Sequence, residues 1–179
     1  MIAPVQPNAD LIAAVQPLIP ALRRYARALL RDRADADDLV QDVLERAMGR
    51  WHQRREAAGT RAWLFAILHN LAMDQLRQRA RRGAAQPIDA VPESLLAIPP
   101  GQETAVHTGD ILSLVSRLPD EHRSVLLLIG VEDLSYAEAA AVLDIPLGTV
   151  MSRLSRARER LRAMIAEEPH RAPALRIVS

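Results

Sequence analysis

The side chains best suited to contact another molecule lie near the C-terminus, where two helices are predicted. Ser135 and Glu138 form a capping box, in which each side chain satisfies the backbone N–H of the other residue. The short helix that they open ends before Pro146, because the residue before a proline disfavours helical geometry. The next helix, 146–165, is predicted to have an apolar stripe of Val150, Leu154, Ala157, Leu161 and Ile165. Its other side is predicted to present Thr149, Met151, Ser152 and Arg156, flanked by Arg153 and Arg158.

A short helix, a tight turn and a longer basic helix are typical of a helix-turn-helix that reads the major groove of DNA. Hydroxyl and guanidinium groups near the start of the second helix suit base edges and phosphates. An amphipathic hairpin with a solvated Arg face would have the same pattern. The pattern alone leaves both interpretations open.

A second group of polar side chains follows helical spacing near residue 40. Asp38, Gln41, Asp42 and Glu45 stand at i, i+3, i+4 and i+7 of a predicted helix, 34–48. They form an acidic stripe opposite the apolar residues. The stripe is either solvated surface or the binding site of a basic partner, which would relieve the repulsion between the carboxylates.

A third helix, 61–82, mixes an aromatic ring with polar groups on one side, through Trp63, Asn70 and Arg77. A stacking surface beside a positive track suits unpaired bases. The alternative is that Trp63 belongs to the core and that the terminal Arg run complements the helix dipole.

Composition excludes several classes of protein. The chain has no Cys, and its five His residues show no metal-ligand spacing, so we expect no metal, no cofactor and no enzyme activity. No apolar run reaches the roughly 18 residues of a membrane helix, and the N-terminus lacks a signal pattern. We therefore expect a cytoplasmic protein without membrane insertion. The net charge is only +1, yet acidic and basic segments alternate twice along the chain.

The elements predict an all-α fold of two small helical domains joined by a flexible linker. Residues 10–82 form a three- to four-helix bundle, 83–106 a Pro-containing linker, 107–166 a helix-turn-helix domain and 167–179 a tail. The helices are predicted at 10–30 (bent or broken at Pro17 and Pro20), 34–48, 61–82, 109–118, 119–130, 135–143 and 146–165, with a loop at 49–60.

Two modules in this order resemble the extracytoplasmic-function (ECF) sigma factors, which retain only regions 2 and 4 of the larger sigma factors. The resemblance lies in DADDLVQDVLERA (35–47), in the segment 61–82 and in LPDEHRSVLLLIGVEDLSYAEAAAVLDIPLGTVMSRLSRARERL (118–161). The segments LRRYARALL and IGVEDLSY also resemble the alphaproteobacterial general-stress subset.

The resemblance implies partners and roles. The partners are core RNA polymerase, through its beta-prime clamp helices and beta flap, promoter DNA and an anti-sigma factor. The acidic stripe would bind the clamp helices, the helix 146–165 would read the −35 element, and Trp63 would wedge at the melted bubble. The −10 element would be contacted by His52, Arg54, Arg55, Trp63, Asn70 and Arg77.

Three further expectations follow from the resemblance. Met151 stands where many relatives carry Arg or Lys, so the −35 contacts should differ. The linker should leave the two domains of the free protein loosely coupled, and a complex with an anti-sigma factor should be compact. A sigma-like decoy that binds only an anti-sigma factor, and a helix-turn-helix repressor, are the alternatives; the intact basic helix 146–165 and the segment 61–82 argue against them.

Overall fold

The computed structural model describes residues 7–53, 59–83 and 113–167, and all regular structure in these ranges is helical. We call 7–83 the N-terminal module and 113–167 the C-terminal module. The N-terminal helices are α1 (Pro7–Val15), the 3-10 turn η1 (Gln16–Leu18), α2 (Ile19–Leu30), α3 (Arg33–Arg50), the 3-10 turn η2 (Trp51–Gln53) and α4 (Thr60–Arg81). A short helical stretch at 113–117 precedes α6 (Asp120–Gly130), α7 (Tyr136–Leu143) and α8 (Leu147–Glu167).

The predicted helices are confirmed where the structure describes them, with one correction at a helix end; residues 109–112 of the predicted helix 109–118 lie outside the described residues. The expected break falls at η1, which contains Pro17, and α2 follows with Pro20 in its first turn. The predicted loop 49–60 is wrong at its start, since α3 continues to Arg50 and η2 to Gln53. Most of the predicted linker and tail lie outside the described residues.

Local caps define the helix ends in the N-terminal module. Helix α2 ends at Arg31, which adopts a left-handed conformation (φ 59°) while its N–H donates to the carbonyl of Arg27. The carboxylate of Asp32 then caps α3 by accepting from the N–H of Asp35 at 2.9 Å. The two caps stand next to each other, so the chain reverses sharply and α3 packs back on α2.

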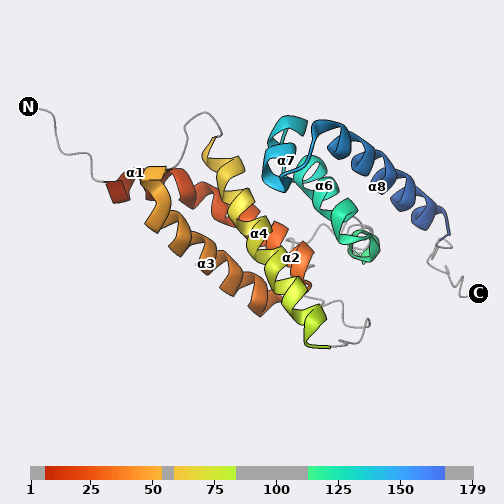
Figure 1. Cartoon of the computed structure of the whole chain (residues 1–179), viewed down its shortest axis with the longest axis horizontal. Coiled ribbons are helices and arrows are strands. Elements are labelled where there is room, and N and C mark those ends of the chain that lie inside the picture. The colour runs from red at the N-terminus through yellow and green to blue at the C-terminus, as the bar shows by residue number, and fades with distance from the viewer. Residues whose placement is uncertain (1–6, 54–58, 84–112, 168–179) are drawn as a thin grey trace, which may run out of the picture.

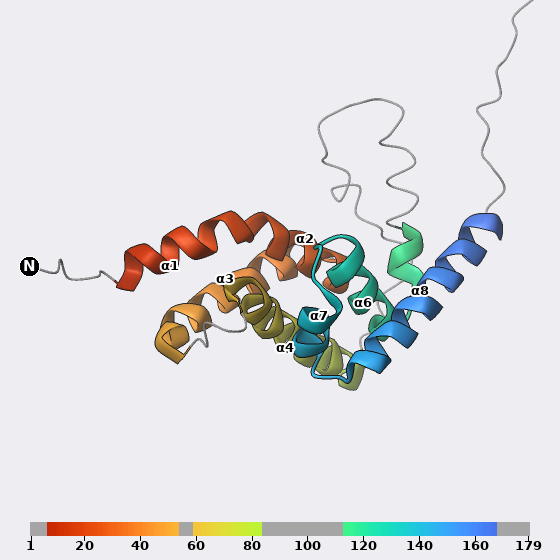
Figure 2. The same ribbon diagram turned by 90° about the horizontal axis from the view of Figure 1, so that it is seen from above.

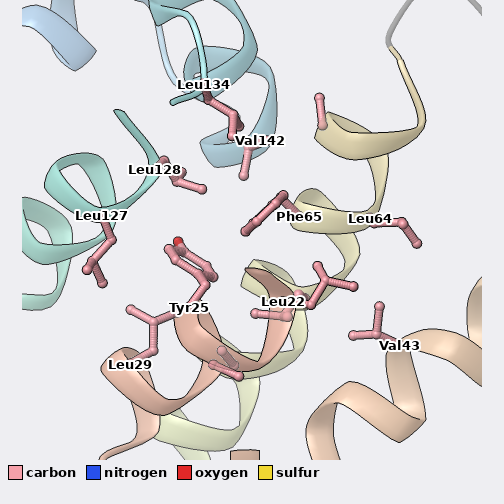
Figure 3. Close-up of a cluster of buried hydrophobic side chains, with 14 of the residues drawn as sticks. Leu22, Tyr25, Leu29, Val43, Leu64, Phe65, Leu127, Leu128, Leu134 and Val142 are labelled. Carbon is pink, nitrogen blue, oxygen red and sulfur yellow. The ribbon is translucent and has the colours of Figure 1, made fainter. Parts of the chain in front are cut away.

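The two modules share one hydrophobic core, contrary to the expectation of loose coupling. Helix α2 packs against α6, and α4 packs against α7 (Figures 1 and 2). Figure 3 shows Tyr25, Leu29 and Phe65 of the N-terminal module facing Leu128 and Val142 of the C-terminal module. The expectation failed because Phe65, which is buried in this shared core, gives α4 an apolar side that faces the C-terminal module.

Candidate nucleic-acid interface

Helix α7 and the turn after it are built as the capping pattern predicts. The Ser135 Oγ accepts from the N–H of Glu138 at 3.2 Å, and the Glu138 carboxylate accepts from the N–H of Ser135 at 2.8 Å. These bonds lower the pKa of the Glu138 carboxyl. Asp144 then turns the chain in a left-handed conformation (φ 52°), and the N–H of Ile145 donates to the carbonyl of Ala140 at 3.1 Å. The angle between α7 and α8 is therefore fixed by local bonds.

Helix α8 packs on α6 and α7 through the predicted apolar stripe. Val150, Leu154 and Ala157 are buried, and Leu161 is partly buried. Ile165, which the pattern placed on the same stripe, is instead 45% exposed because it lies on the last turn, past the end of the packed surface. The anchored part of α8 is thus its N-terminal two thirds, which also carries the candidate DNA-reading residues.

The opposite side of α8 is open to solvent. Met151, Ser152, Arg156 and Arg158 are exposed, whereas Thr149 is partly buried. Arg156 and Arg158 make no hydrogen bond or ion pair with the part of the chain that the structure describes. Their guanidinium groups therefore keep all their donors for another molecule.

Arg153 differs from the other guanidinium groups on this helix. Its Nη2 lies 2.7 Å from Oε2 of Glu121 on α6, and the Arg153 side chain is only 26% exposed. The pair connects α6 with α8 on the side of the helix that turns away from the most exposed residues. Arg153 is thus held in place by its own module, unlike Arg156.

The positive potential of α8 also reaches the buried ring of His122. Burial lowers the pKa of His122, and the nearby Arg160 and Arg156 lower it further, although Glu121 opposes them. The His122 side chain is therefore neutral near pH 7 and adds no charge to this surface.

The acidic stripe lies on the exposed side of α3, as predicted. Asp38, Gln41, Asp42 and Glu45 are exposed, and the Gln41 amide donates to the Glu45 carboxylate at 3.3 Å. Asp38 and Asp42 make no hydrogen bond or ion pair within the described ranges. Asp37, one residue earlier, is internally neutralised, because Arg27 lies 3.1 Å from its carboxylate. The stripe thus begins where the internal ion pairs of α3 end.

The mixed side of α4 presents Trp63, Asn70 and Arg77, which stand seven residues apart and so lie nearly in line along the helix. The Trp63 ring is partly buried and meets the Trp51 ring edge-on, with centroids 6.2 Å apart. Asn70 is exposed, and Arg77 forms an ion pair with Asp74.

His52 of η2 is exposed, near the start of the segment that was assigned to the −10 element. Arg54 and Arg55, which belong to the same group, lie outside the described residues.

The three candidate surfaces do not meet in one pocket. Helices α3 and α8 lie at opposite sides of the molecule, with the other helices between them (Figures 1 and 2). Separate exposed faces fit a protein that contacts several large partners at once better than one that binds a small molecule. No helix in the described ranges is long and apolar enough to cross a membrane.

Sequence reasoning missed the charged residues between the modules. Glu132 is buried in the C-terminal module, and Arg24 and Arg61 of the N-terminal module bind it. The available signal was that Glu132 directly follows the apolar run VLLLIGV, where a solvated acid is unexpected.

Each module matches a family model. Residues 15–69 match the model described as the Sigma2 domain of PhyR, and residues 108–161 match sigma-70 region 4. The chain is 35% identical over 156 residues to the ECF RNA polymerase sigma factor EcfG of Rhodopseudomonas palustris, covering 87% of this chain and 83% of that protein. It is 34% identical to the ECF sigma factor SigE of Mycolicibacterium smegmatis, over 80% of this chain and 57% of that protein.

Solved structures extend the similarity to both modules together. The sigma factor RpoE, solved in complex with the anti-sigma factor NepR from Bartonella quintana, matches with a TM-score of 0.76 and 32% identity, over 89% of this chain and 99% of that one. CnrH, solved in complex with the cytosolic domain of CnrY, matches with a TM-score of 0.66 and 25% identity, over 90% and 91% of the two chains. The chain belongs to the ECF family of RNA polymerase sigma factors, which are DNA-binding regulators of transcription initiation.

Proposed function

We propose that this sigma factor docks on core RNA polymerase through the acidic stripe of α3 and selects promoters with α8 and α4. The observation that carries the proposal is the identity to an ECF sigma factor across 156 residues, which includes both modules. Residues 10–82 would act as region 2, 83–106 as the linker and 107–166 as region 4. The protein would act in the cytoplasm, without catalysing a reaction itself.

The N-terminal part of α8 would enter the major groove of the −35 element. Ser152 and Arg156 are exposed on its outer side, where a hydroxyl and a guanidinium suit base edges. Arg158 lies further along the helix and suits a phosphate. Arg153 would support the fold of the module more than it reads DNA, because it already pairs with Glu121.

The −10 element would be opened and its non-template strand trapped along α4. Unstacking a base step costs a few kcal/mol, so opening needs side chains that bind the freed bases. Trp63, supported edge-on by Trp51, would stack at the edge of the opened region. The exposed Asn70 amide would hydrogen-bond a flipped base, and Arg77, His52, Arg54 and Arg55 would follow the backbone.

An anti-sigma factor would control this activity. The two matched sigma factors, RpoE and CnrH, were each solved with a regulator bound, NepR and CnrY. The similarity covers both modules of this chain, so a comparable regulator would find a comparable surface here. Assignment to a stress response rests on the resemblance of the sequence to the general-stress subset.

The decoy alternative has one observation in its favour, since the matched region 2 model is named for PhyR. An anti-anti-sigma factor PhyR from Bartonella quintana also has a similar fold, but at 19% identity it supports the fold alone. Relatives at 32–35% identity are sigma factors, and the free guanidinium groups of α8 suit DNA.

Run-off transcription with core polymerase on genomic fragments tests the proposal. We expect initiation at a small set of sites that share −35 and −10 elements, and none when the sigma factor is omitted. Binding to polymerase without transcription would indicate a decoy. A palindromic footprint without polymerase would indicate a repressor.

A further inference from the structure

The most deeply buried charge in the described part of the chain lies between the two modules. The Glu132 side chain is only 1% exposed and lies two residues after the end of α6. Arg24 of α2 donates to both its oxygens, from Nε at 2.8 Å and from Nη2 at 2.7 Å. Arg61 of α4 approaches the same carboxylate at 3.7 Å and also donates to the backbone carbonyl of Glu132. One carboxylate of the C-terminal module thus holds two helices of the N-terminal module.

Apolar packing surrounds this ion pair. Tyr25 and Phe65 form an edge-on pair with centroids 5.4 Å apart, and they face Leu128, Leu134 and Val142 across the interface (Figure 3). These contacts drive the modules together, because they remove apolar surface from water. The ion pair adds geometric selectivity, since a buried carboxylate without its guanidinium is strongly unfavourable.

A second set of polar contacts crosses the interface at its other end. The buried guanidinium of Arg123 on α6 donates to the carbonyl of Leu29 on α2 at 3.5 Å, and to Leu118 at 2.7 Å within its own module. Arg31 at the end of α2 donates to the carbonyl of Ser116. Polar contacts therefore connect the two modules at two separate places, which restricts rotation of one module against the other.

We call the arrangement with the two modules packed together the closed form. In this form the helices that read DNA, α8 and α4, are too close together to contact both promoter elements, if the proposed function holds. Elements centred at −35 and −10 are about 25 base pairs apart, or about 85 Å along B-DNA. Helix α8 packs on α7, and α7 packs on α4, so the two reading helices are separated by two helix spacings, roughly 20 Å. Even the full length of α8, about 32 Å, does not make up the difference.

The functional faces themselves stay exposed in the closed form. Asp38 and Asp42 on α3 and Arg156 on α8 are open to solvent while the modules are packed together. Closure therefore leaves these three side chains open to a partner and instead sets the distance between them. Residues 84–112 join the two modules, and the upper limit on the span of any chain of that length is about 100 Å, which permits the open form.

We propose that Arg24, Arg61 and Glu132 form an intramolecular latch that keeps this sigma factor closed until core polymerase separates its modules. The inner faces of the two modules are thus binding sites for each other. This proposal rests on the proposed function only for its consequence in transcription; the latch itself is a property of the free chain.

Distances in the free full-length chain test the latch. The chain has no Cys, so Ala34→Cys on α3 and Ala141→Cys on α7, both exposed, provide two unique spin-label sites. We expect one narrow distance distribution for the otherwise unchanged chain. Arg24→Glu should broaden the distribution and shift it to longer distances, and Glu132→Arg should do the same.

Matched variants separate the latch from a general effect of charge. Arg23→Glu makes the same change on the neighbouring, equally exposed residue, which pairs with Asp37 inside the N-terminal module. The distance distribution of this variant should stay narrow. The exchanged variant Arg24→Glu, Arg61→Gln, Glu132→Arg should restore the narrow distribution. Circular dichroism should show unchanged helix content in every variant.

A broad distribution in the unchanged chain would overturn the proposal. Narrow distributions in both Arg24→Glu and Glu132→Arg, or no restoration in the exchanged variant, would also overturn it. In transcription with core polymerase, Arg24→Glu should reach half-maximal activity at roughly tenfold less protein, because no fraction is lost to the closed form. Failure of all variants to transcribe, with the distances as expected, would reject the proposed function and leave the latch standing.

Discussion

The interface between the modules differs from the outer faces of α3 and α8 in how its charged side chains are paired. At the interface the buried Glu132 carboxylate is paired with Arg24 and Arg61. On the outer faces Asp38, Asp42 and Arg156 are exposed and have no ion pair within the described ranges. Paired, buried charge fixes a conformation, whereas unpaired, exposed charge remains available to a partner of opposite sign.

This contrast explains how one small protein can contain both the proposed latch and the surfaces that would bind polymerase and DNA. Substitutions at the interface should change the population of conformations and leave the contact chemistry intact. Substitutions on the outer faces should remove contacts without opening the molecule.

The largest effect is expected at the acidic stripe. Asp38→Arg combined with Asp42→Arg would place positive charge against a basic polymerase surface, at a cost of several kcal/mol. Binding to core polymerase, measured by fluorescence anisotropy without DNA, should fall at least 100-fold. The latch distances should not change, because α3 faces away from the C-terminal module.

The matched control reverses two exposed acids elsewhere, Glu159→Arg and Glu167→Arg on α8. It changes the net charge equally and should leave polymerase binding within about twofold. Equal loss in both double variants would mean that net charge, and not the stripe, governs the interaction.

The second prediction concerns pH and the interior of the molecule. Burial, aided by the Arg77 cation, lowers the pKa of His69 to about 4, and the Tyr25 hydroxyl lies 3.1 Å from its Nδ1. In the unfolded chain this ring titrates near 6.5. Between these values the unfolded chain binds a proton that the folded chain does not. The free energy of unfolding should therefore decrease as the pH falls from 6.5 towards 4, by up to about 3 kcal/mol.

Urea unfolding at pH 7 and pH 5, compared between the unchanged chain and His69→Gln, isolates this contribution from the other titrating groups. Gln keeps a polar partner for Tyr25 and does not titrate, so His69→Gln should lose less stability at pH 5. The same loss in both proteins would contradict the assignment. Binding of the −35 element by α8 should change much less over this range, since His69 is not on that surface.

The exposed outer faces could be predicted from the sequence, whereas the interface between the two modules could not. The helix spans, the capping box at Ser135 and the exposed stripe on α3 follow from local periodicity, which a sequence displays directly. The packing of Phe65 against Val142 depends on residues far apart in the chain, and no local period encodes it. The burial of Glu132 is equally invisible to local periodicity, because its two guanidinium partners lie about 70 and 110 residues away.

The third prediction separates two guanidinium groups on α8. Arg156 is exposed and makes no ion pair within the described ranges, whereas Arg153 pairs with Glu121. Arg156→Ala should lose about 1–3 kcal/mol of discrimination at one −35 position, the value of a bidentate contact to a base. Arg153→Ala should instead lower the stability of the C-terminal module and preserve the order of preferred sequences.

Transcription from a library of −35 variants measures the discrimination, and thermal unfolding measures the stability. A change in sequence preference with Arg153→Ala as large as with Arg156→Ala would show that the ion pair opens on DNA. The distinction between Arg153 as a structural residue and Arg156 as a DNA-reading residue would then be wrong.

The smallest effect is expected at Met151, where the chain departs from its resemblance to the family. Met151 is 48% exposed and lines a shallow groove with Tyr136, Ser155 and Arg158, so its thioether offers apolar contact where a charged residue would bind guanine or phosphate. Met151→Ala should change −35 binding by less than about twofold. Met151→Arg should raise affinity and steepen its salt dependence, since one new phosphate contact adds about 0.9 to the log–log slope. Binding to the same −35 library across salt concentrations measures both effects. If Met151→Ala lost as much affinity as Arg156→Ala, a different side of α8 would face the groove, because the two residues point about 140° apart on an ideal helix.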